Sequence, residues 1–364
     1  MSYFTSFLAT ESNPSLPIQN FWQWFAQNSS TFWSVVQQGD QIETLFFDQL
    51  MSALEKVHPE LYFLTGMYDE QTVELIITAD GSLKNIVFVE ELIQQAPLLK
   101  GWKFTALKPM LPLDELGIRF NDDYAFQVDN LWFTPLENAD YPDELDIMIH
   151  YAAYNAEDDA MIYNGVCIFL EHLLGELTFT TAIDSIQVKG VEEEDAARIP
   201  ILQLKDYLKW RESEFSQKYD DTVRRDTTDD EYSTFESKTS NGYTTVGLVN
   251  TSVLEWEDCP THPWILKVHI DYDGEAEQGF PSDEVYRLME EFENDVMEVL
   301  TDQKGYLNVA RETGENQRQI YFACSDFRYS SQIMHQMITA YANRLCISYE
   351  LYADKYWQTF RRFR

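Results

Sequence analysis

The sequence is poor in cysteine and in long apolar runs. Four cysteines occur in 364 residues, with no close pair and no Cys-x-x-Cys spacing. That usage excludes a disulfide framework and the common zinc patterns, and it is typical of a reducing compartment. No apolar run approaches the length of a membrane span, and the first residues lack the basic and apolar pattern of a secretion signal. We therefore expect a cytoplasmic protein.

Basic residues are also scarce. Lys and Arg total 26 against 62 Asp and Glu, which gives a formal net charge of −36. Because phosphate neutralisation supplies most of the affinity for nucleic acids, this charge argues against direct binding of DNA or RNA. It argues equally against anionic membrane surfaces. A basic protein partner remains compatible, since opposite charges accelerate association. The other interpretation is that the charge serves solubility alone.

Motifs that carry chemistry are missing. The sequence contains no Gly-x-x-x-x-Gly-Lys-Ser/Thr, Gly-x-Gly-x-x-Gly, Gly-x-Ser-x-Gly or His-Glu-x-x-His. The stretch His269–Gly274 resembles the start of a calcium loop, but a histidine and Phe280 stand where that loop needs carboxylates. Glu171, His172 and Glu176 are possible ligands on one helix, although a histidine on a helix is more often structural. We predict no catalytic residue, no metal and no cofactor.

What the sequence does have is apolar periodicity. Apolar residues make up 45% and aromatic residues 15% of the chain, enough for two or three folded domains. Residues up to about His58 are predicted to be helical, and the dense aromatics of Phe21–Phe25 favour packing between helices over a ligand site. A strand–strand–helix–strand order follows over residues 61–107. Residues 1–190 thus predict a separate α+β domain with N-terminal helices.

A change of composition follows that domain. Residues 191–241 combine an acidic run, a connecting helix from about Leu204, and a polar stretch over 220–240 that is nearly free of aliphatic side chains. We predict a connecting helix and an acidic linker, with the polar stretch as a mobile linker or long loop. The strand-like stretch Tyr243–Leu254 then opens a C-terminal domain over 242–364, where it could add a strand to the sheet.

The C-terminal domain alternates strands with amphipathic helices. Strands are predicted over Trp264–Tyr272, Tyr306–Arg311, Gln319–Cys324 and Cys346–Tyr352. One helix begins after Ser282, which can cap it, and a second begins near Ser331; each has one apolar stripe. Two such helices can cover only one face of a four-stranded sheet. The fold class is therefore α+β, with a C-terminal ferredoxin-like βαββαβ sandwich.

The other face of that sheet is the candidate interaction face. Its expected side chains mix aromatic and polar groups: His269, Asn308, Tyr321, Ser348, Glu350 and Tyr352. The alternative is that another domain or an extra strand of this chain packs there. Arg311 and Arg318 flank the predicted hairpin and are candidates for binding an anion. The alternative is that they brace the hairpin against Glu312 and Glu315.

Three segments carry a family resemblance: GFPSDEVYRLMEEFENDV, ARETGENQRQIYFAC and DKYWQTF. Together they resemble the bacterial domain-of-unknown-function family 695 over roughly Gly242 to Phe363. Phe280 replaces the family's leucine, and Asn294 stands where an acidic residue is usual. The resemblance implies a ferredoxin-like fold and no catalytic residues. It also suggests kinship with the regulator of ribonuclease E activity B family, small acidic proteins that inhibit ribonuclease E.

These observations favour a non-catalytic protein-interaction or regulatory module with a basic protein partner. One alternative is a hydrolase or metal-dependent enzyme with a site at the domain junction, where clefts are common. Another is an acidic nuclease inhibitor or immunity-like protein whose carboxylates imitate phosphate. The sequence leaves the oligomeric state open.

Overall fold

The chain folds into two compact units. The computed structural model describes residues 3–4, 16–120, 124–192, 197–219, 222–239 and 241–364. Unit 1 combines residues 1–12 with 217–364, and unit 2 comprises residues 13–216. The connecting helix α7 therefore lies mostly in unit 2, whereas the residues after it belong to unit 1.

The first half of unit 2 is a three-stranded sheet covered by helices. Its elements are α2 (Leu16–Gln38), η1 (Glu43–Phe47), α3 (Asp48–Leu54), β1 (Tyr62–Met67), β2 (Val73–Thr78), α4 (Ile86–Gln94) and β3 (Trp102–Ala106). β1 and β2 are antiparallel, while β3 runs parallel to β2 because α4 forms the crossover. Phe25 packs 4.8 Å from Trp102, ring centre to ring centre. Most aromatics of α2 are thus core, as predicted, whereas Trp24 and Trp33 are only partly buried.

The second half of unit 2 contains a longer series of strands and helices, which form a two-stranded and a four-stranded sheet. Its elements are β4 (Ile118–Phe120), β5 (Tyr124–Phe126), β6 (Leu131–Leu136), β7 (Asp146–Tyr151), α5 (Asp159–Leu174), α6 (Glu176–Ala182), β8 (Ser185–Gly190), β9 (Ile199–Pro200) and α7 (Leu204–Lys218). β6 and β7 are antiparallel and β8 is parallel to β7. The core includes Val166, Phe169 and Leu170 of α5, packed against Phe133 and Ile149.

Unit 1 contains a six-stranded sheet of ferredoxin-like type. Its elements are β10 (Tyr232–Lys238), β11 (Thr244–Asn250), α8 (Thr251–Leu254), β12 (Trp264–Asp271), α9 (Asp283–Val299), β13 (Tyr306–Gly314), β14 (Gln317–Cys324), α10 (Phe327–Tyr341), β15 (Cys346–Ala353) and η8 (Gln358–Phe363). The strand order is β10-β11-β13-β14-β12-β15. Its last four strands, β13-β14-β12-β15, have the order that the βαββαβ pattern predicts, so the predicted class is confirmed.

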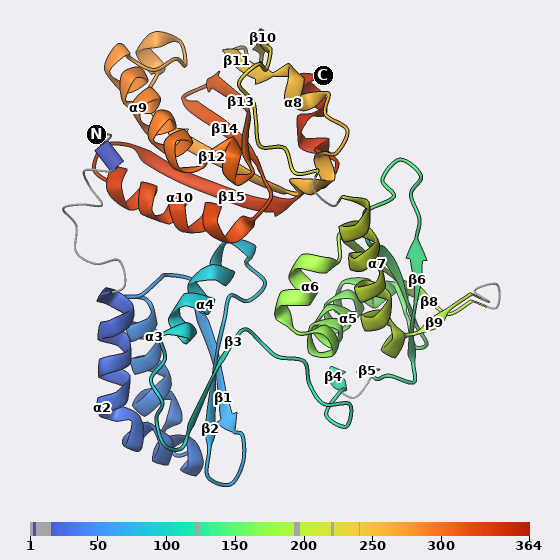
Figure 1. Cartoon of the computed structure of the whole chain (residues 1–364). Helices are drawn as coiled ribbons and strands as arrows, with labels where there is room; N and C mark the ends of the chain where they lie inside the picture. The colour runs from blue at the N-terminus through green and yellow to red at the C-terminus, as the bar shows by residue number, and fades with distance from the viewer. Residues whose placement is uncertain (1–2, 5–15, 121–123, 193–196, 220–221, 240) are drawn as a thin grey trace. The chain divides into compact units, whose positions relative to one another are not determined.

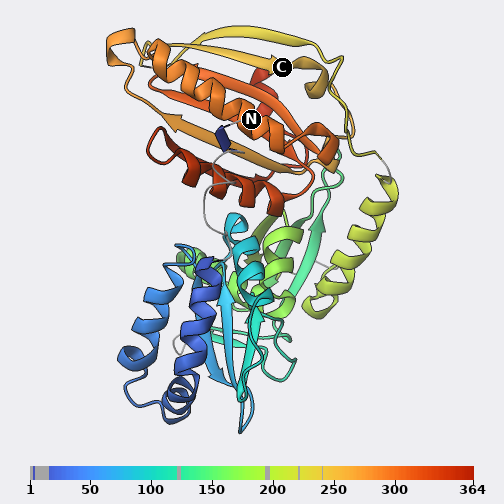
Figure 2. The same ribbon diagram turned by 60° about the vertical axis from the view of Figure 1, so that its left-hand side comes forward.

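Both long helices of unit 1 cover the same face of this sheet (Figures 1 and 2). Leu266, Val268 and Ile270 of β12 enter the core with Phe292 of α9 and Met337 of α10. Local signals set the helix start, since the Ser282 hydroxyl caps α9 by accepting the Val285 N–H. The predicted stripe and cap are therefore both present.

The sheet extends further than the sequence indicated. β11 pairs with β13, as the strand-like stretch before the domain suggested. β10 then pairs antiparallel with β11 over Tyr232–Lys238. The prediction of a mobile linker or long loop over 220–240 is wrong for these residues. Their side chains are mostly exposed, so an edge strand of this kind leaves almost no apolar periodicity in the sequence.

Gly247 of β11 leaves room for an aromatic ring of β10. Phe235 lies directly across from Gly247, and a Cβ on Gly247 would lie 2.1 Å from the Phe235 ring. Gly247→Ala is expected to destabilise unit 1 by about 1–3 kcal/mol, because the ring must move. Gly66→Ala in β1 is the control, since a Cβ there meets no atom within 4 Å. Thermal unfolding compares the two variants, and equal effects would contradict the packing.

No single helix among the described residues is long and apolar enough to cross a membrane. One bent pair, Ala156–Leu174 with Glu176–Ala182 at 114°, passes the same test of length and composition only when taken together.

Candidate protein-interaction site

The register of unit 1 arranges side chains in rows across the face opposite α9 and α10, called here the second face. The rows are Cys346, Asp271 and Gln317; Ser348, His269, Gln319 and Glu312; Glu350, Lys267, Tyr321 and Ala310; Tyr352, Ile265, Ala323 and Leu307. Every residue predicted for the interaction face, Asn308 excepted, lies in these rows. The alternation of the strands therefore placed them correctly on one surface.

Half of the second face is covered by the end of the chain. Trp357 and Phe360, both with 0% exposure, pack against Ile265, Tyr321 and Ala323. The Asp354 carboxylate fixes this segment by accepting the N–H groups of Gln358 and Thr359, each at 2.8 Å. The alternative prediction was that another domain or an extra strand packs on this face; what packs there is neither, but Trp357 and the short helix η8 that follows it. Tyr321 is buried and Tyr352 is partly buried beneath it.

The other half of the second face is open and polar. It is called here the open strip and consists of His269, Asp271, Gln317, Gln319, Cys346, Ser348 and Glu350, which are half-buried or exposed. His269 Nε2 lies 3.0 Å from the Glu350 carboxylate. On β14, the Gln317 amide donates to Asp271 at 2.8 Å. Such a strip has ordered hydrogen-bonding groups but no large apolar patch.

A chain of hydrogen bonds connects the open strip to the covered half. The Arg362 guanidinium, which also pairs with Glu312, donates to the Tyr321 hydroxyl at 2.7 Å. Tyr321 donates to Gln319, and Gln319 donates to Gln317. Burial raises the pKa of Tyr321, so this hydroxyl stays protonated and keeps its role as donor. These bonds hold the amides of the strip in fixed orientations.

Asn308 lies on the opposite side from the prediction. It pairs with Phe322, whose ring belongs to the core beneath α9 and α10. A bulge between Asn308 and Ala310 shifts the register, so that Ala310, two positions on, pairs with Tyr321 of the second face. Strict alternation assumes an unbroken strand, which is why the sequence assigned Asn308 to the wrong face.

Arg311 and Arg318 also face the helices and form no open anion site. Arg311 Nη1 lies 2.7 Å from Glu290 and 3.0 Å from Glu293, both on α9. Arg318 Nη1 contacts the same carboxylates at 3.1 and 3.4 Å and is 1% exposed. The two arginines therefore brace the β13–β14 hairpin, as the alternative prediction had it. Their partners, however, are the α9 carboxylates Glu290 and Glu293 instead of Glu312 and Glu315.

The buried histidine His262 makes the stability of unit 1 depend on pH. Burial lowers the pKa of His262 from 6.5 to about 4, and its ring stacks edge-on with Trp256 at 5.2 Å. Between pH 6.5 and 4 the unfolded chain binds a proton that the folded chain does not. Stability is therefore expected to fall by about 3 kcal/mol as the pH drops through this range. Denaturant titrations at several pH values measure this fall. The free energy of unfolding of His262→Phe should decrease less between pH 6.5 and 4 than that of the wild type; an equal decrease would contradict the burial of His262.

The possible metal ligands of unit 2 form a structural clamp instead. Glu176 is 0% exposed and joins the two halves of the unit through four donors. They are the Thr78 hydroxyl at 2.6 Å and the backbone N–H groups of Ala79 at 3.1 Å, Gly81 at 3.2 Å and Lys108 at 2.9 Å. Glu171 pairs with the Lys108 ammonium at 3.2 Å. Within the described ranges no group of three or more His, Cys, Asp or Glu side chains could hold a metal.

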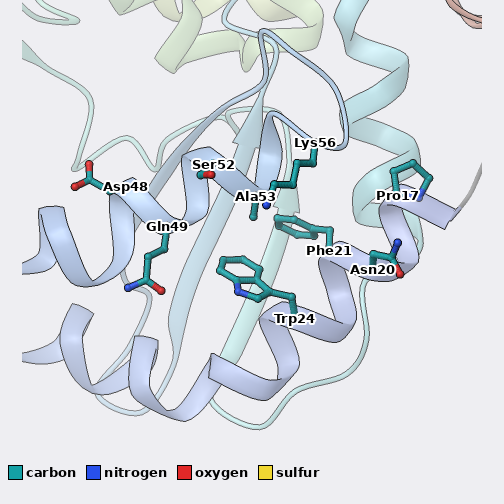
Figure 3. Close-up of a pocket in the computed structure, with 9 residues that line it drawn as sticks. All are labelled: Pro17, Asn20, Phe21, Trp24, Asp48, Gln49, Ser52, Ala53 and Lys56. Carbon is teal, nitrogen blue, oxygen red and sulfur yellow. The ribbon is translucent and has the colours of Figure 1, made fainter. Parts of the chain in front are cut away.

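A groove lies between α2 and α3 of unit 2 (Figure 3). It has a volume of about 710 Å³, with Phe21, Trp24 and Ala53 as its apolar floor. Its rim is polar, with Asp48 and Lys56 as the charged groups. Asp48 is the first residue of α3, and Lys56 lies two positions after the last residue of that helix.

Unit 1 is thus a ferredoxin-like sheet extended by two strands, with helices on one face and its C-terminal segment on half of the other. Residues 234–363 match the model of a family of unknown function, DUF695. Searches of curated proteins and of solved structures found no match. The quoted family motifs have structural roles here: a helix cap at Ser282, the β13–β14 hairpin, and Asp354 with Trp357 in the cover. The kinship with the regulator of ribonuclease E activity B family stays a prediction.

Proposed function

We propose that the chain is a non-catalytic protein-interaction module that docks a partner protein on the open strip in the cytoplasm. The observation that carries this proposal is the ordered polar strip beside an edge strand, on a face whose other half is sealed by aromatic side chains. In the part of the chain that the structure describes, β15 pairs with β12 alone, so its outer edge can accept a further strand.

The chemistry of the strip favours a basic partner. Asp271 and Glu350 contribute carboxylates, and the amides of Gln317 and Gln319 supply fixed hydrogen-bonding groups. The net charge of −36 adds a long-range attraction for a basic surface. Binding should therefore be sensitive to salt, because exposed charges are screened within about 10 Å at 0.1 M ionic strength. The four free cysteines support a reducing location.

The test is capture from native lysate with the full chain and two matched charge variants. Glu350→Arg reverses a charge on the open strip, and Glu298→Arg makes the same change on an exposed position of α9. The proposal expects a partner that Glu298→Arg retains and Glu350→Arg loses by about tenfold or more, as rim charges control encounter. In the complex, labelling of the Cys346 thiol should slow. Capture that is indifferent to Glu350→Arg, with Cys346 still reactive, would refute the docking surface.

The same variants separate the nuclease-inhibitor alternative. Purified basic ribonucleases are titrated with the wild-type chain, with Glu350→Arg and with Glu298→Arg. Inhibition that is lost only in Glu350→Arg would name the partner class as a nuclease. Inhibition that both variants weaken alike would trace to net charge alone and would count against a specific strip.

A further inference from the structure

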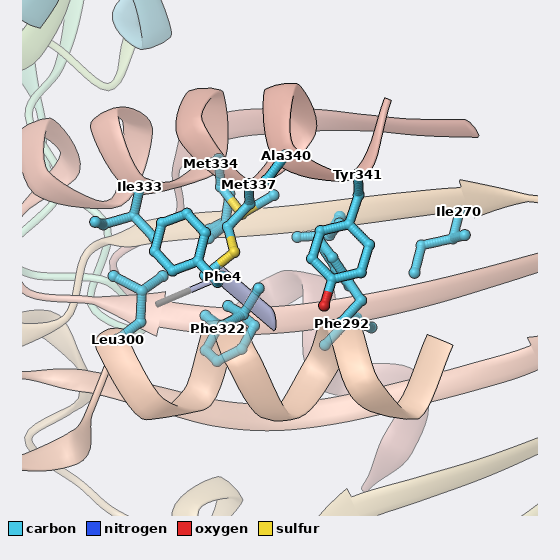
Figure 4. Packing of buried hydrophobic residues seen from close by; sticks show 14 of the residues in the cluster. Phe4, Ile270, Phe292, Leu300, Phe322, Ile333, Met334, Met337, Ala340 and Tyr341 are labelled. Atoms are coloured by element: carbon cyan, nitrogen blue, oxygen red, sulfur yellow. The ribbon is translucent and has the colours of Figure 1, made fainter. Parts of the chain in front are cut away.

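Two residues near the start of the chain contact the helices of unit 1: Phe4 is buried there, and Tyr3 lies beside it at the surface. Phe4 is 1% exposed and belongs to the core between α9 and α10, although residues 13–216 form the other unit. Figure 4 shows its ring next to Ile333, Met334 and Met337 of α10, with Leu300 on the other side. The contact is therefore between a tethered segment and a groove formed by two helices.

The groove recognises the backbone of this segment as well as its side chain. The Phe4 N–H donates to Asp295 Oδ2 at 2.8 Å, and the Tyr341 hydroxyl donates to the same oxygen at 2.8 Å. Asp295 is itself buried. A buried carboxylate needs donors, and here one of them is supplied by the inserted segment. The space between α9 and α10 therefore presents a specific hydrogen-bond acceptor to the segment in addition to apolar surface.

The neighbouring residue makes a second set of contacts at the rim. The Tyr3 hydroxyl donates to the Ala340 carbonyl at 3.2 Å, and its ring meets Tyr341 edge-on at 4.9 Å. The Arg344 guanidinium lies 4.2 Å from the centre of the Tyr3 ring and is held there by Glu291. An aromatic pair with one deep ring and one ring at the rim thus matches a pocket, a buried acceptor and a cationic rim.

The groove belongs to the part of the chain that matches the family model, and the segment that fills it does not. α9 and α10 lie within residues 234–363, the part that matches the family model, whereas Tyr3 and Phe4 lie outside it. We propose that the groove between α9 and α10 is a peptide-binding site for an aromatic pair, which this chain fills in cis with its own Tyr3–Phe4. The segment acts as a latch that exchanges while both units stay folded. This proposal does not depend on the open strip, which lies on the other face.

The test uses full-length chains and a fluorescent peptide of residues 1–12. In the wild type the tethered segment competes at an effective concentration on the order of 1 mM. The Phe4→Ala chain, whose own segment lacks the deep ring, should therefore bind the peptide about tenfold or more tightly than the wild type does. A peptide of the same composition in scrambled order should bind neither chain. Equal binding of the peptide to both chains, or no binding, would overturn the latch.

A second variant covers the case in which Phe4→Ala destabilises the chain. A protease site inserted between residues 12 and 13 leaves both groove and segment unchanged until cleavage. After cleavage the proposal expects the released segment to be replaced by labelled peptide while the protein remains folded by circular dichroism. A segment that exchanges only when the unit unfolds would overturn it. A dimer of the wild type that Phe4→Ala abolishes would also overturn the proposal, because the segment of one chain would then bind the groove of another.

Discussion

Trp357→Ala is expected to lower the free energy of unfolding of unit 1 by about 3–5 kcal/mol, the usual cost of removing a buried aromatic side chain. Trp357 has no exposed surface, and its indole N–H donates to the His262 carbonyl at 3.0 Å. Its loss leaves a cavity above Ile265 and Ala323 and weakens the cover of the second face. Chemical denaturation followed by circular dichroism measures the change.

Trp210→Ala is the matched control for this prediction. Trp210 lies on α7 in unit 2 and is 54% exposed, so its removal should change stability by less than about 1 kcal/mol. A second readout is binding of a dye that reports exposed apolar surface, which should rise for Trp357→Ala alone. Equal stability losses in the two variants would mean that the C-terminal segment does not seal the sheet.

Glu293→Ala is expected to cost unit 1 about 3 kcal/mol, the lower end for breaking a buried ion pair, because Arg311 and Arg318 keep only the partly exposed Glu290 as a counter-charge. Glu293 is buried on α9 and faces both Arg311 at 3.0 Å and Arg318 at 3.4 Å. Burial raises the pKa of Glu293, and the two arginines oppose that shift by favouring the carboxylate. The side chain therefore matters as the acceptor that allows Arg318 to be buried.

Glu291→Ala, two positions earlier on the same helix, is its control. Glu291 forms a bidentate pair with Arg344 at 3.0 Å on a partly exposed surface. Exposed pairs contribute about 0–1 kcal/mol, so this substitution should be nearly neutral. Thermal unfolding of both variants in the same buffer separates the cases. A neutral Glu293→Ala would show that the arginines reorient into solvent, contrary to the packing described.

The parts of the fold that the sequence predicted are those with local signals. The stripe of α9, its Ser282 cap and the alternation of β12 each follow from neighbouring residues, and together they imply the ferredoxin-like order. The turn of the β13–β14 hairpin is also local, since Glu315 and Asn316 both adopt positive φ, at 54° and 64°. Five of the six side chains assigned to the second face followed from the same alternation.

The features that escaped prediction depend on contacts distant in sequence. The cover over Tyr321 comes from residues after β15, and their aromatic motif does not state which surface they bury. The bulge that turns Asn308 inward has no signature in the alternation. Phe4 lies 291 positions from Asp295, so no window of sequence could relate them. The α9 partners of Arg311 and Arg318 were missed for the same reason, because a charged residue such as Glu293 on an amphipathic helix is expected to face solvent.

The three native thiols of unit 1 test the two-sided account of its sheet most directly. Cys324 lies under the helices, Cys259 lies in the cluster beneath the cover, and Cys346 is exposed on the open strip. Burial raises the pKa of Cys324 to about 12 and that of Cys259 to about 11, which further suppresses their thiolates. In native protein at pH 8, labelling followed by mass spectrometry should modify Cys346 rapidly. Cys259 and Cys324 should react at least about a hundredfold more slowly than Cys346, because they become accessible only when the structure opens. Rapid labelling of Cys259 or Cys324, or protection of Cys346 in the isolated chain, would contradict a sheet sealed on one face and half open on the other.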